Sequence, residues 1–140
     1  MTQINWSKQI QLAALSGGVA VILGALGAHA LKAHLTELQL NAFETASRYH
    51  FLHSLLIIIC GLLGASSIKH NTKRLAMASK LLWIGMLCFS GSIYLLTTRG
   101  LMGLDWLKFL GPITPIGGVL LTIGWLLIGF SLYSYKSDNK

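Results

Sequence analysis

The chain has 140 residues, of which 54% are hydrophobic and only 11% are charged, and its formal net charge is +7. A water-soluble domain usually carries about 25% charged residues, so this composition excludes an ordinary soluble domain and predicts an integral membrane protein. The positive charge does not indicate nucleic acid as a partner. The basic residues form no single stripe with interleaved aromatic residues, and they gather instead at the ends of apolar stretches.

Four apolar stretches hold most of the chain. Each is near the length of about 20 residues that a helix needs to cross a hydrocarbon core about 30 Å thick. We therefore expect an all-α fold, a four-span transmembrane helix bundle, that forms a single integral membrane domain over residues 1–140. The spans are expected at approximately 10–31, 49–68, 81–98 and 112–134.

The basic residues at the span ends predict the orientation. With four spans the two termini share a side of the membrane, and that side carries seven lysines and arginines against four on the other side. The more basic side is usually cytoplasmic, so we expect both termini in the cytoplasm and membrane lipids as partners. The first set is Lys8, Lys69, Lys73, Arg74, Lys80, Lys136 and Lys140, and the second is Lys32, Arg48, Arg99 and Lys108.

Small residues recur along one face of the first span and again along the fourth. They are Ser16, Ala20, Gly24 and Ala28 at steps of four, and Gly117, Gly124 and Ser131 at steps of seven. Lipid tails are as apolar as leucine, so spans associate through close backbone approach along such small-residue faces. These faces could pack within one chain or between chains, and the sequence leaves a homo-oligomer or a membrane protein partner open.

The sequence between the first two spans predicts the start of a helix. Thr36 and Gln39 have the spacing of a capping box, which predicts a short amphipathic interfacial helix. No glycine or proline interrupts the chain from Thr36 to Cys60, so this helix is expected to lead into the second span. Its polar edge includes Glu44 and Arg48 in the favoured acid-first pairing.

The connection between the third and fourth spans, residues 99–111, is apolar for a loop. It predicts an interfacial segment with the Trp106 indole at headgroup depth.

Two histidines interrupt the apolar pattern. His29 falls at the outer end of the first span and His53 near the outer start of the second, with Glu44, Arg48 and Tyr49 in the same leaflet. An ionisable group at membrane depth is costly unless it faces protein or water, so these five residues are the candidate ligand-binding cluster. The alternative is a neutral histidine that hydrogen-bonds a partner and holds two helices together.

The chain carries no GxSxG, HExxH, phosphate-loop or CxxC motif. We therefore predict a protein that is not an enzyme, with no catalytic residues, no cofactor and no metal site. The favoured function is binding of a lipid, a small ligand or a partner protein by the outer-leaflet cluster. The alternatives are a small-solute or proton transporter and a metal- or haem-binding protein, each using His29 and His53.

Three motifs in order suggest a family. They are Gly24-x-x-Gly27-Ala28-His29-x-Leu31, then Phe43-x-Thr45-Ala46-x-Arg48-Tyr49-x-x-x-His53, then Thr114-Pro115-x-Gly117-Gly118 with Gly124-Trp125. They resemble the bacterial small membrane protein family catalogued as domain of unknown function 423, related to the eukaryotic transmembrane protein 256. The resemblance covers nearly the whole chain and implies a four-span protein of the bacterial cytoplasmic (inner) membrane. It implies no activity, although its motif residues coincide with the candidate cluster.

Overall fold

A computed structural model of the chain describes residues 5–133, and these form helices joined by short connections. Four helical segments are long and apolar enough to cross a membrane, which confirms the all-α, four-span fold. The elements are α1 (Trp6–Leu26), the π-helical turn η1 (Gly27–Leu31), α2 (Glu37–Ala65), α3 (Thr72–Met86), the π-helical turn η2 (Leu87–Gly91), α4 (Ser92–Thr98), the 3-10 helix η3 (Asp105–Leu110) and α5 (Ile113–Tyr133).

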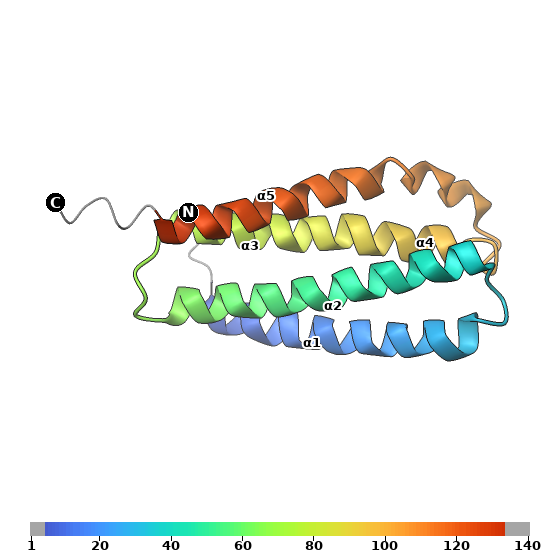
Figure 1. Ribbon diagram of the computed structural model, residues 1–140, viewed down its shortest axis with the longest axis horizontal. Coiled ribbons are helices and arrows are strands. Elements are labelled where there is room, and N and C mark those ends of the chain that lie inside the picture. The colour runs from blue at the N-terminus through green and yellow to red at the C-terminus, as the bar shows by residue number, and fades with distance from the viewer. Residues whose placement is uncertain (1–4, 134–140) are drawn as a thin grey trace.

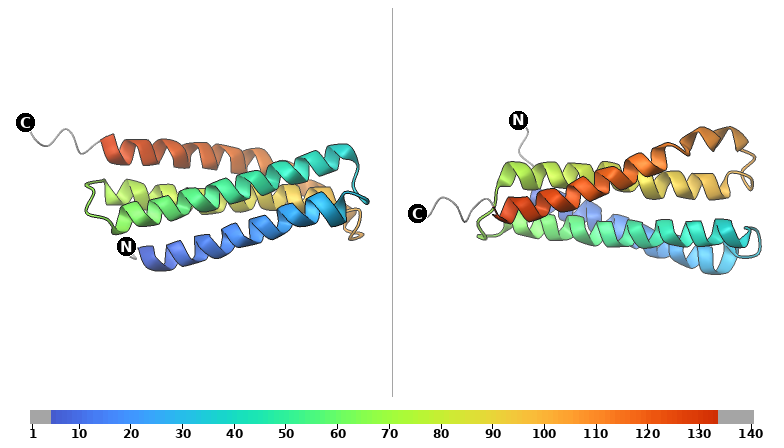
Figure 2. Two further views of the ribbon diagram at one scale, coloured as in Figure 1. Left: turned by 60° about the horizontal axis from the view of Figure 1, so that its bottom comes forward. Right: turned by 45° about the horizontal axis from the view of Figure 1, so that its top comes forward.

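The helices run up and down along one axis, so that α1 begins and α5 ends at the same end of the bundle (Figure 1). They form two pairs, because α1 packs mainly on α2 and α5 packs mainly on α3. Figure 2 shows α5 crossing α3 obliquely, while α1 follows α2. The continuous third span, α3 with η2 and α4, contacts α2 and so joins the two pairs.

The capping box at the start of α2 is confirmed. Thr36 Oγ1 accepts the backbone N–H of Gln39 at 3.3 Å, and the Thr36 N–H donates to Gln39 Oε1 at 2.9 Å. The predicted amphipathic segment forms the first turns of α2, which continues without a break from Glu37 to Ala65. At about 1.5 Å per residue this helix is roughly 43 Å long. It therefore extends well beyond a hydrocarbon core of about 30 Å.

Small residues bring α1 and α2 together, as the sequence predicted. Ser47 Oγ donates to the Ala20 carbonyl at 3.0 Å, and the same oxygen lies 2.9 Å from where a Cβ on Gly24 would be. Ala28, the last member of the predicted ridge, is exposed and does not take part. The small-residue face of α1 therefore packs against α2 of the same chain.

The small residues of α5 pack on α3 and η2. Gly117 is buried, and a Cβ there would overlap the backbone of Phe89. A Cβ on Gly85 would lie 2.9 Å from the Leu121 nitrogen. Gly124 is buried against the side chain of Leu82. The predicted face on the fourth span is thus confirmed as a close backbone contact inside one chain.

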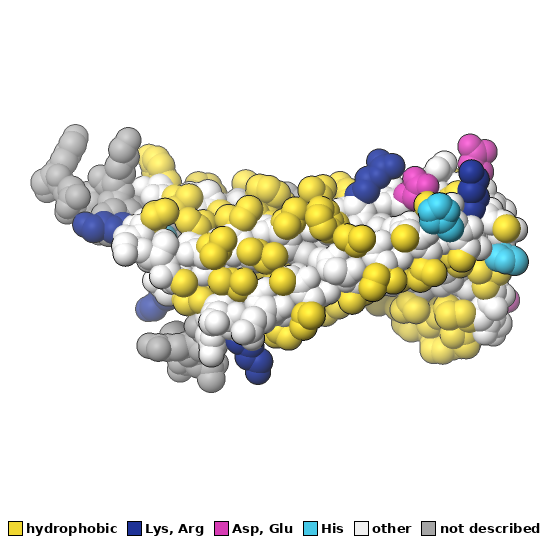
Figure 3. Space-filling view, turned by 90° about the horizontal axis from the view of Figure 1, so that it is seen from below, with side chains coloured by type: hydrophobic (Ala, Val, Ile, Leu, Met, Phe, Trp, Pro, Cys, Tyr) yellow, Lys and Arg dark blue, Asp and Glu magenta, His cyan; other side chains and the backbone are white. Residues whose placement is uncertain are grey.

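The distribution of side chains on the surface fits a bundle that crosses a membrane. Figure 3 shows hydrophobic side chains over the middle of one face of the molecule and charged side chains at its two ends. The segment before α5 is the short helix η3, where the exposed rings of Trp106 and Phe109 stack with centroids 5.8 Å apart. The depth of these rings in the membrane stays a prediction.

Candidate functional site

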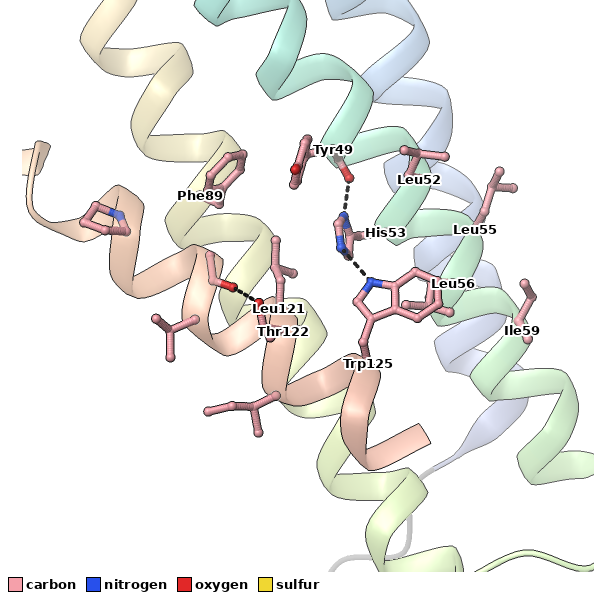
Figure 4. Close-up of a pocket in the computed structure, with 14 residues that line it drawn as sticks. Tyr49, Leu52, His53, Leu55, Leu56, Ile59, Phe89, Leu121, Thr122 and Trp125 are labelled. Carbon is pink, nitrogen blue, oxygen red and sulfur yellow. Dashed lines mark hydrogen bonds between the residues drawn. The ribbon is translucent and has the colours of Figure 1, made fainter. Parts of the chain in front are cut away.

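A groove of about 940 Å³ opens between α2 and α5. Nearly all of its lining side chains are apolar, and they come from α2, η2 and α5 (Figure 4). The lining residues are Tyr49, Leu52, His53, Leu55, Leu56, Ile59, Phe89, Pro115, Gly118, Val119, Leu121, Thr122, Ile123 and Trp125. The groove exists because α5 packs on α3 and not directly on α2, so that a space remains between α5 and α2.

His53 crosses this groove and links its two walls. Its side chain is buried, with 6% exposure. The ring Nδ1 lies 2.7 Å from the Tyr49 carbonyl oxygen, and the Trp125 indole N–H donates to Nε2 at 3.3 Å (Figure 4). A carbonyl can only accept and an indole N–H can only donate, so the ring is neutral with its proton on Nδ1. His53 therefore acts as the neutral histidine that holds two helices together.

The same contacts bear on the transport hypothesis. Both ring nitrogens of His53 are already engaged, one by a carbonyl and one by an indole N–H that does not ionise near neutral pH. The stretches 81–98 and 113–133 carry no aspartate, glutamate, lysine or arginine that could continue a proton relay. The geometry favours a structural role for His53 over a titrating one.

Aromatic rings form the end of the groove that lies nearer the start of α2. The Tyr49 ring stacks on His53 with centroids 5.6 Å apart and contacts the Phe89 ring at 4.6 Å. Tyr49 comes from α2 one helical turn before His53, whereas Phe89 comes from the π-helical turn η2. These contacts hold α2 against the third span.

Glu44 and Arg48 lie on α2 beyond this aromatic end. Arg48 Nη2 and Glu44 Oε2 are 3.5 Å apart, and the side chains are 74% and 40% exposed. Arg48 precedes Leu52, Leu55 and Ile59 by four, seven and eleven residues, so it shares a helix face with these groove-lining leucines and isoleucine. Arg48 therefore lies on the same face of α2 as residues that line the groove.

The structure does not bring His29 to the other candidate residues, and this corrects the prediction of a single cluster. His29 is exposed in η1. In the antiparallel hairpin Gly27 lies against Phe43, so residue 29 lies opposite residue 41, and His29 and His53 differ in level by about twelve residues, or roughly 18 Å. The prediction took the ends of the two apolar stretches, near residues 31 and 49, to lie at one level, whereas the hairpin places residue 29 opposite the first turns of α2. The two histidines do not share a haem iron or a metal ion at this separation.

His50 belongs to a polar network that sequence reasoning missed. Its Nε2 lies 2.9 Å from Ser16 Oγ and its Nδ1 lies 3.4 Å from the Tyr94 hydroxyl, while Ser54 Oγ donates to Ser16 Oγ at 3.1 Å. These contacts connect α1, α2 and α4 inside the bundle. Each hydrogen bond between spans stabilises a membrane bundle by about 0.6 kcal/mol on average. We therefore interpret this network as one that holds the helices together. The signal was available in the helical register of His50 and Ser54.

Phe89 and Trp125 were also missed as site residues. Trp125 is 55% exposed and stands in the third family motif, but only the fold shows that its indole reaches His53. Within residues 5–133, no three histidine, cysteine, aspartate or glutamate side chains come together in a way that could hold a metal ion. Protein metal sites usually need three or four such ligands, so the described part of the chain offers no donor set for the metal alternative.

Comparison with known proteins identifies relatives. Residues 23–118 match the model of the family described as protein of unknown function (DUF423). A UPF0382 membrane protein of Staphylococcus aureus is 38% identical over 127 residues, which cover 90% of this chain and 95% of the relative. A UPF0382 membrane protein of Staphylococcus epidermidis is 41% identical over 120 residues, covering 85% of this chain and 89% of the relative.

No solved structure matches the chain. The family match spans well over half of the sequence, and the relatives are named as membrane proteins, in agreement with the four apolar helices. The chain belongs to the DUF423 family of multi-pass membrane proteins of unknown function.

Proposed function

We propose that this protein is a non-enzymatic, lipid-binding membrane protein whose groove between α2 and α5 holds an acyl chain of a phospholipid. In this proposal Arg48 lies beside the lipid phosphate. The observation that carries the proposal is the apolar groove of about 940 Å³ between two helices of a membrane bundle. Its size is at the upper end of the range of about 300–1,000 Å³ that is usual for ligand sites.

The chemistry of the lining favours an acyl chain over water or a polar solute. The groove-lining nitrogens of His53 and Trp125 are hydrogen-bonded to protein groups, and the Thr122 hydroxyl donates to the Gly118 carbonyl at 2.9 Å. Apolar cavities stay dry. A groove on the side of a membrane bundle adjoins hydrocarbon, so lipid chains are the molecules that fill it.

The position of Arg48 supports a headgroup contact. Arg48 is separated from Ala65, the inner end of α2, by about 17 residues, or roughly 26 Å. With Ala65 at the inner border of a hydrocarbon core about 30 Å thick, that distance would put the guanidinium near the outer border. Arginine binds phosphate oxygens through paired N–H donors. A lipid whose chain enters the groove along Leu52 and Leu55 would place its phosphate at this level.

Native mass spectrometry of gently purified protein tests the headgroup contact. Wild type is expected to retain one phospholipid per chain, and Arg48→Ala is expected to retain about fivefold less, because an exposed charge contact is lost. Lys32→Ala is the control, since Lys32 is another exposed cation at the same end but follows η1 on the far side of the first hairpin. If wild type carries no lipid, or if both variants retain it equally, the proposed function fails.

We further propose that the membrane is the bacterial inner membrane and that both termini face the cytoplasm. The excess of lysine and arginine on the side of the termini supports this orientation. Single cysteines at Asn41 and Lys73, placed in a background without Cys60 and Cys88, provide the test. Both positions are exposed on opposite ends of the bundle, so a membrane-impermeant reagent applied to intact cells should label position 41 only. Labelling of position 73 alone, or of both, would overturn the orientation.

A further inference from the structure

We infer that the lipid headgroup recognised at the outer end of the groove is zwitterionic and carries a primary ammonium, as in an aminophospholipid. Arg48 would bind its phosphate and Glu44 its ammonium group. This inference rests on the proposed function and deepens it, because it names the headgroup class for the same site.

Arg48 and Glu44 form an ion pair beyond the aromatic end of the groove. Within residues 5–133, the side chains of Arg48 and Glu44 contact each other at 3.5 Å and make no other hydrogen bond or ion pair. A guanidinium carries several N–H donors and a carboxylate carries two acceptor oxygens. Each side chain therefore keeps hydrogen-bonding capacity that points to a ligand with both an anionic and a cationic end.

The other outer-end ion pair shows the contrast. Arg99 Nε lies 3.9 Å from Asp105 Oδ1, and Arg99 Nη1 also donates to the Leu96 carbonyl at 2.9 Å. Its side chain is 31% exposed, against 74% for Arg48. The Arg99 side chain is thus held by the backbone of α4 and by Asp105 of η3. Arg48 is held by Glu44 alone and stands in line with the α2 wall of the groove.

The presence of Glu44 decides between headgroup classes. A carboxylate beside the guanidinium repels a headgroup that is only anionic, such as phosphatidylglycerol. A primary ammonium on the same headgroup turns that repulsion into a charge-assisted hydrogen bond. A choline group has no N–H to donate, and proteins recognise quaternary ammonium by cages of several aromatic rings. Phe43, the aromatic residue next to Glu44 in sequence, is buried with 2% exposure and does not face such a group, so the site suits ethanolamine better than choline.

The spacing on α2 is compatible with one headgroup bridging both residues. Glu44 and Arg48 are one helical turn apart, about 6 Å along the axis. The phosphate and ammonium of an ethanolamine headgroup are joined by two carbons, so they can reach neighbouring side chains on one helix face. Glu44 lies farther from the membrane centre than Arg48, in the same order as ammonium and phosphate along an extended lipid.

A competition experiment tests the inference. Purified protein is exchanged into mixed micelles of phosphatidylethanolamine, phosphatidylglycerol and phosphatidylcholine in equal amounts with identical acyl chains, and bound lipids are identified by native mass spectrometry. Wild type is expected to retain phosphatidylethanolamine about 2- to 5-fold over the other two lipids, the range given by an exposed ion pair. Glu44→Gln should remove this preference while one lipid per chain remains bound. Glu37→Gln, a control carboxylate in the first turn of α2, should leave the preference unchanged.

The possible outcomes separate the two proposals. Equal retention of the three lipids by wild type overturns the headgroup inference and leaves lipid binding intact. Preference for phosphatidylglycerol also overturns it and assigns the headgroup contact to Arg48 alone. Unchanged preference in Glu44→Gln removes the role of the carboxylate. Binding of none of the lipids contradicts the proposed function itself.

Discussion

Replacing Gly117 with valine is expected to lower the free energy of unfolding by about 1–3 kcal/mol or more, the usual cost of overpacking a tight contact. Gly117 lies where α5 crosses η2, and any Cβ there would overlap the backbone of Phe89. Backbone atoms cannot rotate away as a flexible side chain can, so α5 must shift from the third span. The measurement is the thermal unfolding midpoint of the purified protein in mild detergent.

Gly129→Val is the matched control for this prediction. Gly129 is an exposed residue of the same helix, and no heavy atom lies within 4 Å of the position of an added Cβ. Valine there adds the same β-branched side chain to α5 without a clash, so the midpoint should stay within a few degrees of wild type. An equal loss of stability in both variants would show that helix propensity dominates, and would contradict the close-contact account.

Filling the groove is expected to have the largest effect on bound lipid. Val119 lines the groove and is 59% exposed, so Val119→Trp should occupy the space of an acyl chain and reduce lipid retention about tenfold or more. The bundle should remain folded, because the added ring does not enter the contact between α5 and α3. Native mass spectrometry gives the bound lipid per chain.

Val21→Trp supplies the comparison. Val21 is 58% exposed on α1, away from the groove, so the substitution adds the same ring to a membrane-facing valine of equal exposure. It should leave the bound lipid unchanged. If both variants lose lipid to the same extent, the lipid is bound nonspecifically around the bundle and the groove is not its site.

Much of the fold could be predicted from the sequence because its signals are local. Apolar length fixes the spans, the spacing of Thr36 and Gln39 fixes a helix start, and the glycines of the fourth span predict a close helix contact. Each of these features is confirmed. They depend on residues within a few turns of one another, or on the chemistry of the bilayer, and need no knowledge of which helices become neighbours.

The site was less predictable because it depends on tertiary arrangement. The groove requires that α5 packs on α3 and diverges from α2, and the partner of His53 is Trp125, 72 residues away. His29 was misplaced for a different reason, since the ends of two apolar stretches do not show which residues of a hairpin lie at the same level. Of the predicted cluster, Tyr49 and His53 line the groove and Glu44 and Arg48 lie on α2 beyond its aromatic end, whereas His29 lies elsewhere.

The central claim is that an acyl chain occupies the groove, and photocrosslinking tests it most directly. Protein reconstituted with a phospholipid that carries a diazirine midway along one chain is irradiated, and the adducts are mapped by peptide mass spectrometry. The account predicts adducts concentrated on the groove-lining residues of α2 and α5, with few on the exposed face of α1. Adducts spread evenly over the membrane-facing residues of all helices would contradict it.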